Sequence, residues 1–596
     1  MCLRIPLFPS HDETAQTVCC LWLMILALGL CSAAQAQESP YDPSWYDPSR
    51  TYVKVAVVND GVHQITGADL TTLGMSTSSI SPRTLKVYEN GQEIPLWYIG
   101  DPGSLMPDSK ILFVGQRNRG TDENWAYRNN PEWQSSTYYS LYTDTTFYWL
   151  SWGGVTGLRY ERVDFDIASA SDVFAFRDTV HVEQDRLYHD GAPADAENPF
   201  FTEGEGYYLN RFTHSNTNPV SLNYEVRLQN LARGENAEDS VFVTLKLIGR
   251  TSTRHRVSLE LETIVGGNKA FTLFDETDWT GATFQTLRAG VPASQIPTDR
   301  SNLFSARLTS HNEFDANPNR IFFDWIEYSF VRELAATGNT LRFSFEEGGT
   351  RRMHLKGFGN DPVLIFNPDD QRLYELTPQG GSLVFTDRTT GPSVYWATSA
   401  SAVRAPAMVS LERSSDWATL TNEADYVIIT SRALRASAEI MADYRRSQNG
   451  YRVAVVDIQD VYDQFDYGRP TPIAIRRFVY QTQRWRTRPR FLLFWGDALY
   501  ADRRRGRPEW EVPSYGKASS DGWFGMQYGG PNDWSEVLAL GRIPLRDDAT
   551  GLTFIQKLGA YESTPLDTWQ KRMLMLVGGR GELEQNLLQR FVEPWS

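Results

Sequence analysis

The sequence predicts a series of antiparallel β domains followed by one α/β domain. From residue 51 to about residue 400, short runs of alternating apolar and polar residues are separated by Gly and Asn turns, a pattern typical of β-sandwiches and jelly rolls. From about residue 425, continuous apolar runs alternate with helical patterns, as in a parallel sheet covered on both faces. The chain has 596 residues, which is enough for roughly three to five ordinary domains.

The N-terminus resembles an export signal. An apolar run over residues 19–30 is too short to span a bilayer comfortably, and the small-x-small pattern Ala34-Gln35-Ala36 follows it. We therefore predict a signal peptide over residues 1–36 and a mature chain that begins at Gln37. A lipid attached at Cys31 and a retained membrane anchor are the alternatives, although the bulky Leu30 fits a lipid-attachment site poorly.

The cysteine positions restrict the chemistry of the mature chain. All four cysteines, Cys2, Cys19, Cys20 and Cys31, lie within the predicted signal. The predicted mature chain therefore has no disulfide, no thiolate nucleophile and no cysteine metal ligand. The eight histidines show no metal-ligand spacing, and the net charge of −15 argues against nucleic acid as the main partner.

The β part is expected to form an N-terminal β domain over residues 37–155 and a β-sandwich or jelly-roll region over residues 156–405. In the first domain, an alternating strand at 53–57 runs into the turn Asn59-Asp60-Gly61. In the second region, apolar residues alternate over 241–247, and a second alternating run over 257–261 is expected to face them across a polar turn.

The α/β part begins with a buried strand at 425–430. A helix is expected from Arg432 to about Gln448, with Ser431 as N-cap and Gly450 beyond its end. Further strands at 451–457 and 491–495 and a helix over 473–485 complete the pattern. Ligands of such sheets bind beyond the carboxyl ends of the strands, and Asp457 and Asp497 occupy these positions.

Familiar catalytic loops are absent from the sequence. It has no Walker loop, no nucleophile-elbow serine and no dinucleotide fingerprint. Gly578-Gly579-Arg580-Gly581 superficially resembles a phosphate loop but lacks the Lys-Ser/Thr ending. We interpret it as a turn between a strand at 573–577 and a helix over 582–592. The residues alone therefore indicate an exported, β-rich protein with an α/β domain of undefined chemistry.

Nine short segments carry a resemblance to a known family. In this order they are similar to segments of the gingipain-like (C25-type) cysteine peptidases: Ala424–Thr430, Asn449–Val453, Val461–Gly468, Ile473–Phe478, Leu492–Ala498, Val512–Tyr515, Ser520-Asp521, Gly541–Pro544, and Ala560–Glu562 with Trp569. The segments around Asp60-Gly61, Glu89–Gly91 and Tyr148–Leu150 also look like the β-rich front of the large gingipain-like proteins of type IX secretion.

The resemblance implies a caspase-like fold of two α/β subdomains. The first would span residues 420–565, and residues 566–596 would begin a second one that is incomplete at the C-terminus. Catalysis in the family uses a His in a Gly-His-Gly turn and a Cys, whose thiolate attacks the peptide carbonyl. Both positions would lie beyond Ser596, so the resemblance implies an exported cysteine endopeptidase of which the printed chain is an inactive fragment. No cofactor is required, and calcium is a candidate ligand.

Three residues are the candidate site residues. Glu562 matches a family glutamate that orients the catalytic His, and its alternative is a solvated glutamate at a helix end. Asp497 and Asp521 are expected to line the substrate cleft or to bind calcium, whereas helix capping and turn hydrogen bonds explain them equally well.

The implied partners are a protein or peptide substrate and outer-membrane secretion machinery, with no nucleic acid. The implied location is the extracellular space or the outer-membrane surface of a Gram-negative bacterium. Two other functions stay open. One is a non-catalytic exported protein that acts in adhesion or secretion. The other is an array of carbohydrate-binding modules, suggested by 18 Trp and 28 Tyr residues, although aromatic residues also pack β-sheets.

Overall fold

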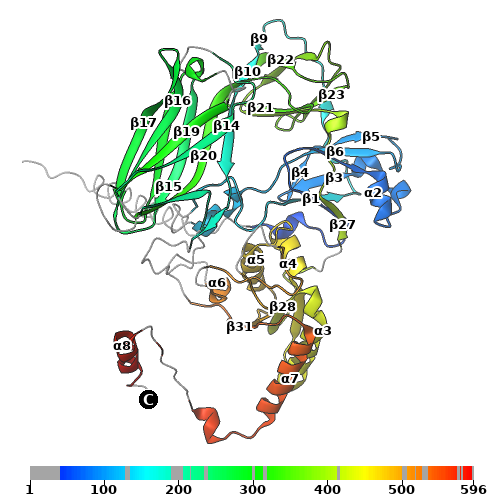
Figure 1. The fold of residues 1–596 in the computed structure, drawn as a ribbon. Coiled ribbons are helices and arrows are strands. Elements are labelled where there is room, and N and C mark those ends of the chain that lie inside the picture. Colours follow the sequence, from blue (N-terminus) through cyan, green and yellow to red (C-terminus); the bar gives the residue numbers. More distant parts are fainter. Residues whose placement is uncertain are drawn as a thin grey trace, which may run out of the picture.

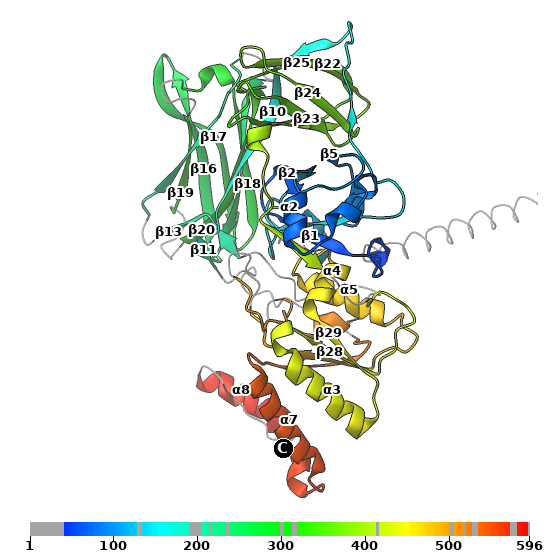
Figure 2. The same cartoon turned by 90° about the vertical axis from the view of Figure 1, so that its right-hand side faces the viewer.

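The structure is a computed structural model of the whole chain. It describes residues 41–127, 134–189, 206–214, 217–233, 239–297, 303–312, 319–412, 416–499, 506–516, 519–526, 535–572, 578 and 581–593. Three β units and one α/β unit make up the structure, as Figures 1 and 2 show. The expected fold class, β-sandwich domains followed by an α/β domain, is confirmed.

The first unit packs a five-stranded sheet on a three-stranded sheet. The larger sheet has the order β27-β1-β7-β3-β4 and the smaller one β2-β6-β5. The core between them includes Val53, Val55 and Phe113, none of which is exposed. The elements are β1 (Tyr52–Val57), β2 (Gly61–Thr66), α2 (Gly67–Thr72), β3 (Lys86–Glu89), β4 (Gln92–Ile94), β5 (Trp97–Ile99), β6 (Lys110–Gly115), η4 (Gly120–Tyr127), β7 (Thr146–Ser151) and β27 (Met408–Glu412).

The central unit is a two-layer antiparallel sandwich. One sheet has the order β10-β20-β15-β18, with β13 also on β20, and it packs on β14-β19-β16-β17. Alternation along the strands places apolar side chains such as Leu245 and Leu259 between the layers. The strands are β10 (Ala175–Glu183), β11 (Leu187–Tyr188), β12 (Tyr207–Tyr208), β13 (Asn210–His214), β14 (Val220–Arg227), β15 (Val241–Gly249), β16 (Arg254–Val265), β17 (Asn268–Thr280), β18 (Phe284–Val291), β19 (Leu303–His311) and β20 (Asn319–Glu333).

The third unit is a smaller sandwich that the sequence analysis did not separate from the rest of the region over residues 156–405. Its sheets have the orders β21-β26-β23-β24-β8 and β25-β22-β9. Phe343 and Tyr395 stack in its core, with ring centroids 4.9 Å apart. The strands are β8 (Glu161–Arg162), β9 (Ser171–Val173), β21 (Thr340–Phe345), β22 (Gly349–Lys356), β23 (Val363–Asn367), β24 (Arg372–Leu376), β25 (Ser382–Thr389) and β26 (Ser393–Ser399).

Two pairings differ from the sequence-based picture. The sequence places the runs at 241–247 and 257–261 across a turn from each other. In the structure they lie in opposite layers of the central sandwich. β15 pairs with β18 and β20, whereas β16 pairs with β17 and β19. In addition, β27 returns to the first sheet beside β1. The proposed boundaries near residues 155 and 405 stay predictions.

The α/β unit contains a parallel sheet of order β29-β28-β30-β31. Continuous apolar runs form its inner strands because both faces are covered. α3 and α7 cover one face, where Ile428 and Trp495 lie, and α4, α5 and α6 cover the other, where Ile429 and Phe494 lie. The elements are β28 (Tyr426–Thr430), α3 (Arg435–Asn449), β29 (Val453–Asp457), α4 (Ile458–Phe465), α5 (Pro472–Thr482), β30 (Phe491–Trp495), α6 (Gly522–Gly525), β31 (Ala539–Ile543) and α7 (Asp548–Ser563).

The expected helix ends are partly corrected. Gly450 caps α3 in the left-handed conformation, with φ +67°, as expected. Ser431 instead precedes a short 3-10 turn, Arg432–Leu434, and its side chain makes no capping hydrogen bond. The sequence-based helix therefore starts three residues too early.

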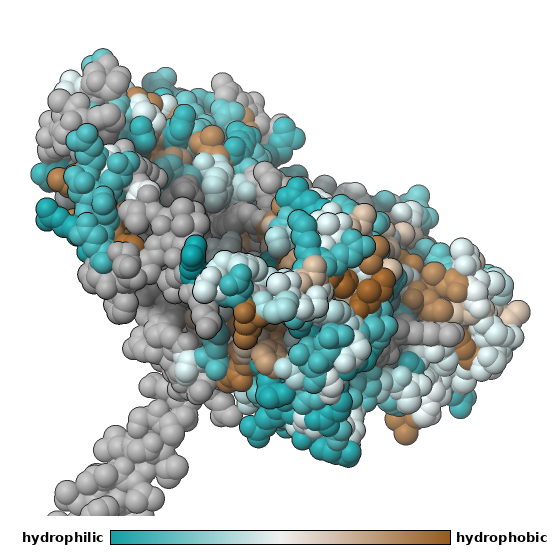
Figure 3. Space-filling view, turned by 90° about the horizontal axis from the view of Figure 1, so that it is seen from below, coloured by the Kyte–Doolittle hydropathy of each residue, from teal (hydrophilic) through white to brown (hydrophobic). Residues whose placement is uncertain are grey.

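The last described helix, α8 (Glu582–Val592), confirms the helix expected there, whereas the expected strand at 573–577 lies outside the described residues. α8 buries no residue against the rest of the described chain. Leu583 is 85% exposed and Phe591 is 76% exposed. The view from below in Figure 3 shows apolar residues gathered in patches at this end of the molecule. Among the described residues, no helix combines the length and apolarity that a bilayer span requires.

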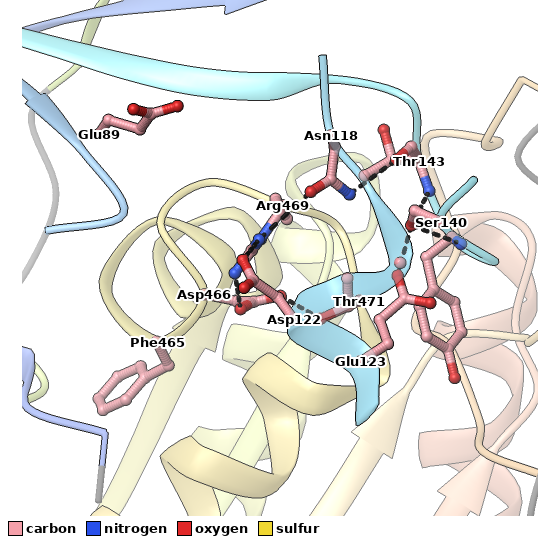
Figure 4. Close-up of polar contacts among 12 residues, drawn as sticks. Glu89, Asn118, Asp122, Glu123, Ser140, Thr143, Phe465, Asp466, Arg469 and Thr471 are labelled. Atoms are coloured by element: carbon pink, nitrogen blue, oxygen red, sulfur yellow. Dashed lines mark hydrogen bonds and ion pairs between the residues drawn. The ribbon is translucent and has the colours of Figure 1, made fainter. Parts of the chain in front are cut away.

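A buried polar junction joins the first unit to the α/β unit. Asp466, which follows α4, accepts hydrogen bonds from Arg469, Arg477 and Thr471 at 2.9, 2.6 and 2.5 Å. Arg469 also reaches Asp122 at 2.5 Å, in the 3-10 segment of the first unit. Figure 4 shows Arg469 directed at both carboxylates. These contacts fix the α/β unit against the β part.

We predict that Glu123, beside this junction, makes stability depend on pH. Complete burial raises the pKa of its carboxyl to about 7, although hydrogen bonds from the Ser140 hydroxyl and the Leu141 amide oppose the shift. A raised folded-state pKa stabilises the folded chain below the unfolded pKa of 4.5, and this contribution is lost as the pH rises through about 7. The free energy of unfolding of Glu123→Gln, relative to that of the wild type, should therefore rise by roughly 3 kcal/mol from about pH 5 to pH 8.

Urea unfolding curves of both proteins at these two pH values measure the effect. Glu93→Gln is the control, because Glu93 lies in the same unit but is only half-buried. An equal pH dependence in wild type and Glu123→Gln contradicts the prediction.

Candidate functional site

The carboxyl edge of the parallel sheet gathers the polar residues of the α/β unit. β29 ends at Asp457, and Gly496 and Asp497 follow β30. Gly496 is required by close packing, because a Cβ atom there would lie 2.8 Å from the backbone oxygen of Trp510. The edge is thus built from strand ends and from the segments that pack directly on them.

Arg542, near the end of β31, holds this edge together. Its guanidinium uses all five of its N–H donors. Nε and Nη2 donate to the two carboxylate oxygens of Asp521 at 2.7 and 2.8 Å. Nη1 donates to the backbone oxygens of Gly496 and Val512 at 2.8 and 2.7 Å, and Nη2 also reaches Pro513 at 3.2 Å. Asp521 therefore anchors Arg542 and sets the shape of the edge.

Asp497 is the more available carboxylate. Its Oδ1 accepts from the Ala498 backbone N–H at 2.9 Å, and its Oδ2 accepts from Nε of Arg546 at 2.8 Å. The Arg546 side chain is 64% exposed, so this ion pair is weak. A cationic group of a ligand could replace Arg546 at little cost.

Asp457 and Glu511 complete the acidic groups of the edge. Asp457 caps α4 by accepting from the Gln459 backbone N–H at 3.0 Å, and the largely exposed Arg432 lies 3.5 Å from it. Burial raises the pKa of the Glu511 carboxyl above its usual range, which Arg507 at 3.4 Å opposes. Asp457 and Glu511 are therefore each held by contacts within the α/β unit.

Glu562 lies at the opposite end of the sheet. It sits near the end of α7, which runs beside α3 away from the carboxyl edge (Figure 1). Its carboxylate accepts from Tyr444 at 2.7 Å and from Arg445 at 2.9 Å. Burial works in the opposite direction, but these two contacts hold the pKa of Glu562 below its usual range. The structure thus brings Asp497 and Asp521 together and keeps Glu562 apart, and its role in orienting a histidine stays a prediction.

The described residues offer no evident calcium site. Within the parts of the chain that the structure describes, no three His, Cys, Asp or Glu side chains come together in a way that could hold a metal ion. Asp497 and Asp521 are each occupied by an arginine. Calcium binding at this edge stays a prediction.

Sequence reasoning missed the arginines of the site. Arg542 lies in the segment Gly541–Pro544, which was used only as a family marker, and Arg546 follows it directly. No usable signal was present, because the glycine and arginine in β31 hide it as a strand and the backbone oxygens that Arg542 contacts are not visible in the sequence.

Comparison with known proteins relates the α/β unit to a family of peptidases. Residues 419–593 match the model of peptidase family C25. This range contains the whole parallel sheet and the polar edge described above. This part of the chain is therefore similar to peptidase family C25, in agreement with the sequence resemblance.

The fold of the chain as a whole is similar to that of dimeric latent PorU from Porphyromonas gingivalis. The match has a TM-score of 0.59 and 17% sequence identity, and it covers 91% of this chain and 52% of the PorU chain. The chain thus spans about half the length of that protein. At this identity the likeness establishes the arrangement of domains.

The other comparisons add little. The CBM22-2 xylan-binding domain from Paenibacillus barcinonensis Xyn10C matches with a TM-score of 0.11 and 8% identity, covering 16% of this chain and 62% of that domain. That similarity is too low to support an argument. No curated protein matches the chain.

Proposed function

We propose that the chain is part of an exported gingipain-like cysteine endopeptidase that cleaves protein substrates. The observation that carries this proposal is the family C25 match over residues 419–593, on a parallel sheet whose carboxyl edge is polar and ordered. Ligands of such sheets bind at this edge.

The edge residues divide into two proposed roles. Asp521 and Arg542 keep the segments around Gly496 and Val512 in place, so they act as positioning residues. Asp497 lies at the carboxyl edge of the sheet, where its carboxylate would attract a basic substrate side chain in exchange for Arg546. A calcium ion at this edge is the alternative use of the same carboxylate.

The proposed chemistry needs a nucleophile from outside the mature chain. A histidine takes the proton from the cysteine thiol, and the thiolate attacks the peptide carbonyl to form an acyl-enzyme that water hydrolyses. Residues 37–596 contain no cysteine. The proposal therefore requires the catalytic Cys, and with it the catalytic His, in chain beyond the printed sequence.

Export and the secretion partner belong to the same proposal. The apolar run at 19–30 with its small-x-small end supports a signal peptide. The PorU-like fold supports a place at the cell surface beside outer-membrane secretion machinery.

A non-catalytic exported protein is the second candidate. The specific observation that favours it is the extent of the β part, whose strands run from residue 52 to residue 412. In that case the three β units would carry the function, in adhesion or secretion.

We predict that purified residues 37–596 hydrolyse no peptide in an iodoacetamide-sensitive way. The protein made from the complete reading frame should hydrolyse peptides, and iodoacetamide should block it, because the reagent alkylates the thiolate. Fluorogenic peptide libraries measure both. Thiol-dependent hydrolysis by residues 37–596 contradicts the assignment of the nucleophile, and a complete protein without thiol-dependent hydrolysis favours the non-catalytic function.

Variants of the active protein test the edge residues. Asp497→Asn should raise KM for basic substrates about tenfold and leave kcat nearly unchanged. Asp443→Asn is the matched control, because Asp443 pairs with Arg446 on the exposed surface of the same unit. If Glu562 orients the catalytic histidine, Glu562→Gln should lower kcat. If it does not, kcat should stay unchanged.

A further inference from the structure

A pocket lies where the first unit meets the outer face of the central sandwich. Its volume is about 440 Å³, which falls within the range of small-molecule sites, roughly 300–1,000 Å³. One wall is the segment around η4 and the residues after it, and the other is the middle of β20. The wall includes Arg119, Thr121, Gln134, Tyr138, Trp325 and Glu327.

The walls of the pocket are fixed by hydrogen bonds. The indole N–H of Trp325 donates to the backbone oxygen of Ser135 at 3.0 Å. The side-chain amide of Gln134 donates to the backbone oxygen of Gly120 at 2.6 Å. The Trp325 bond joins the central sandwich to the first unit, and the Gln134 bond joins two parts of the same segment. The pocket is therefore formed before any ligand binds.

Each charge in the wall already has a partner. Arg119 donates to Asp60 at 2.7 Å, and its guanidinium lies over the Tyr138 ring at 4.3 Å. Glu327 accepts from Nδ1 of His181 at 2.8 Å.

The histidine behind Glu327 is shared between two carboxylates, Glu327 and Glu183. Burial lowers the pKa of His181, but hydrogen bonds to the carboxylates of Glu183 and Glu327 raise it overall, which favours the charged imidazolium. The Glu327 side chain is 36% exposed. Its carboxylate can therefore also accept a hydrogen bond from a hydroxyl group of a ligand.

The chemistry of the wall points to a hydroxyl-rich, uncharged ligand. Thr121 and the serines and threonine of 135–137 provide hydroxyl groups, Gln134 provides an amide, and Glu327 provides an acceptor. The half-buried Trp325 ring offers an aromatic surface, whose negative face attracts the weakly positive C–H groups of a sugar ring. We propose that this pocket binds a neutral saccharide.

Other ligand classes fit less well. An anion would meet Glu327, and Arg119, the one cation among the described lining residues, already binds Asp60. A lipid would place hydrocarbon against the Glu327 carboxylate and the lining hydroxyl groups, which is unfavourable. The saccharide site lies in the β part of the chain, so it does not depend on the peptidase proposal.

The test is binding of the purified mature chain to an array that carries neutral, sulfated and sialylated oligosaccharides beside lysine-rich peptides. We expect neutral oligosaccharides to bind. By titration calorimetry with the best neutral oligosaccharide, Trp325→Ala should weaken binding about tenfold or more, since tenfold corresponds to about 1.4 kcal/mol. Glu327→Gln preserves the shape of the side chain and should weaken binding several-fold.

Phe242→Ala is the matched control, because Phe242 is 44% exposed on the neighbouring strand β15 but does not line the pocket. It should bind as the wild type does, and the melting temperature of each variant reports whether it folds. The proposal is overturned if no neutral oligosaccharide binds, if acidic glycans or lysine-rich peptides bind in their place, or if folded Trp325→Ala and Glu327→Gln both bind as tightly as wild type.

Discussion

Asp466→Asn should lower the free energy of unfolding of the α/β unit by about 3–5 kcal/mol. The Asp466 side chain is 3% exposed and receives two arginines and one hydroxyl. Asparagine keeps the shape but leaves the buried Arg469 and the neighbouring Arg477 facing a neutral amide. Removing one member of a buried charge cluster is costly because the remaining charges stay out of water.

Urea unfolding followed by the helical circular dichroism signal measures this loss, because the long helices all lie in the C-terminal part of the described chain. Asp425→Asn is the matched control: Asp425 also binds an arginine, Arg452 at 3.0 Å, but that arginine is 49% exposed. The control should change stability by less than about 1 kcal/mol. Equal effects of both substitutions would mean that the junction is solvated.

The sequence predicted the α/β unit well because burial on both faces leaves a strong local signal. The strands at 426–430, 453–457 and 491–495 are continuous apolar runs, and few other structures contain such runs next to amphipathic helices. Right-handed connections between parallel strands then determine the face of the sheet on which each helix lies. β31 was missed because its pattern, Ala-Leu-Gly-Arg-Ile, is interrupted by a glycine and an arginine.

Pairing between distant segments could not be predicted in the same way. The alternation of apolar and polar residues identified β15 and β16 as strands. The same alternation is expected whether the two strands lie in one sheet or in two facing layers. β27 is separated from β1 by about 350 residues of other domains, and no local pattern specifies such a partner. Long-range pairing depends on the complete set of strands that compete for each edge.

The candidate site shows the same division. Asp497 follows from a strand end, which is visible in the sequence, whereas Asp521 was selected through the family segment Ser520-Asp521. Glu562 was selected by family resemblance alone, and its distance from the carboxyl edge follows from the direction of α7, which a single sequence does not reveal. Arg542 organises the edge through backbone oxygens, and such acceptors leave no trace in the sequence.

The second large effect is expected at the other buried ion pair between the β part and the α/β unit. Lys54 on β1 and Asp463 on α4 lie 2.5 Å apart, with side chains 4% and 1% exposed. Lys54→Met retains the aliphatic chain near the Phe147 ring but leaves Asp463 with a single side-chain donor, Gln459 at 2.9 Å. The free energy of unfolding should fall by about 3–5 kcal/mol.

The double variant Lys54→Met with Asp463→Leu separates the cost of an orphaned charge from the worth of the pair. Because both charges are then absent, it should recover most of the stability lost by either single variant, as buried pairs replaced by apolar residues of similar volume commonly do. Urea unfolding of the four proteins gives the coupling energy between the two positions. If the losses of the two single variants simply add in the double variant, the side chains do not interact and the contact is not a buried ion pair. Recovery would show that the β part and the α/β unit are held in register by charge matching, while the surrounding apolar contacts supply most of the stability of the interface.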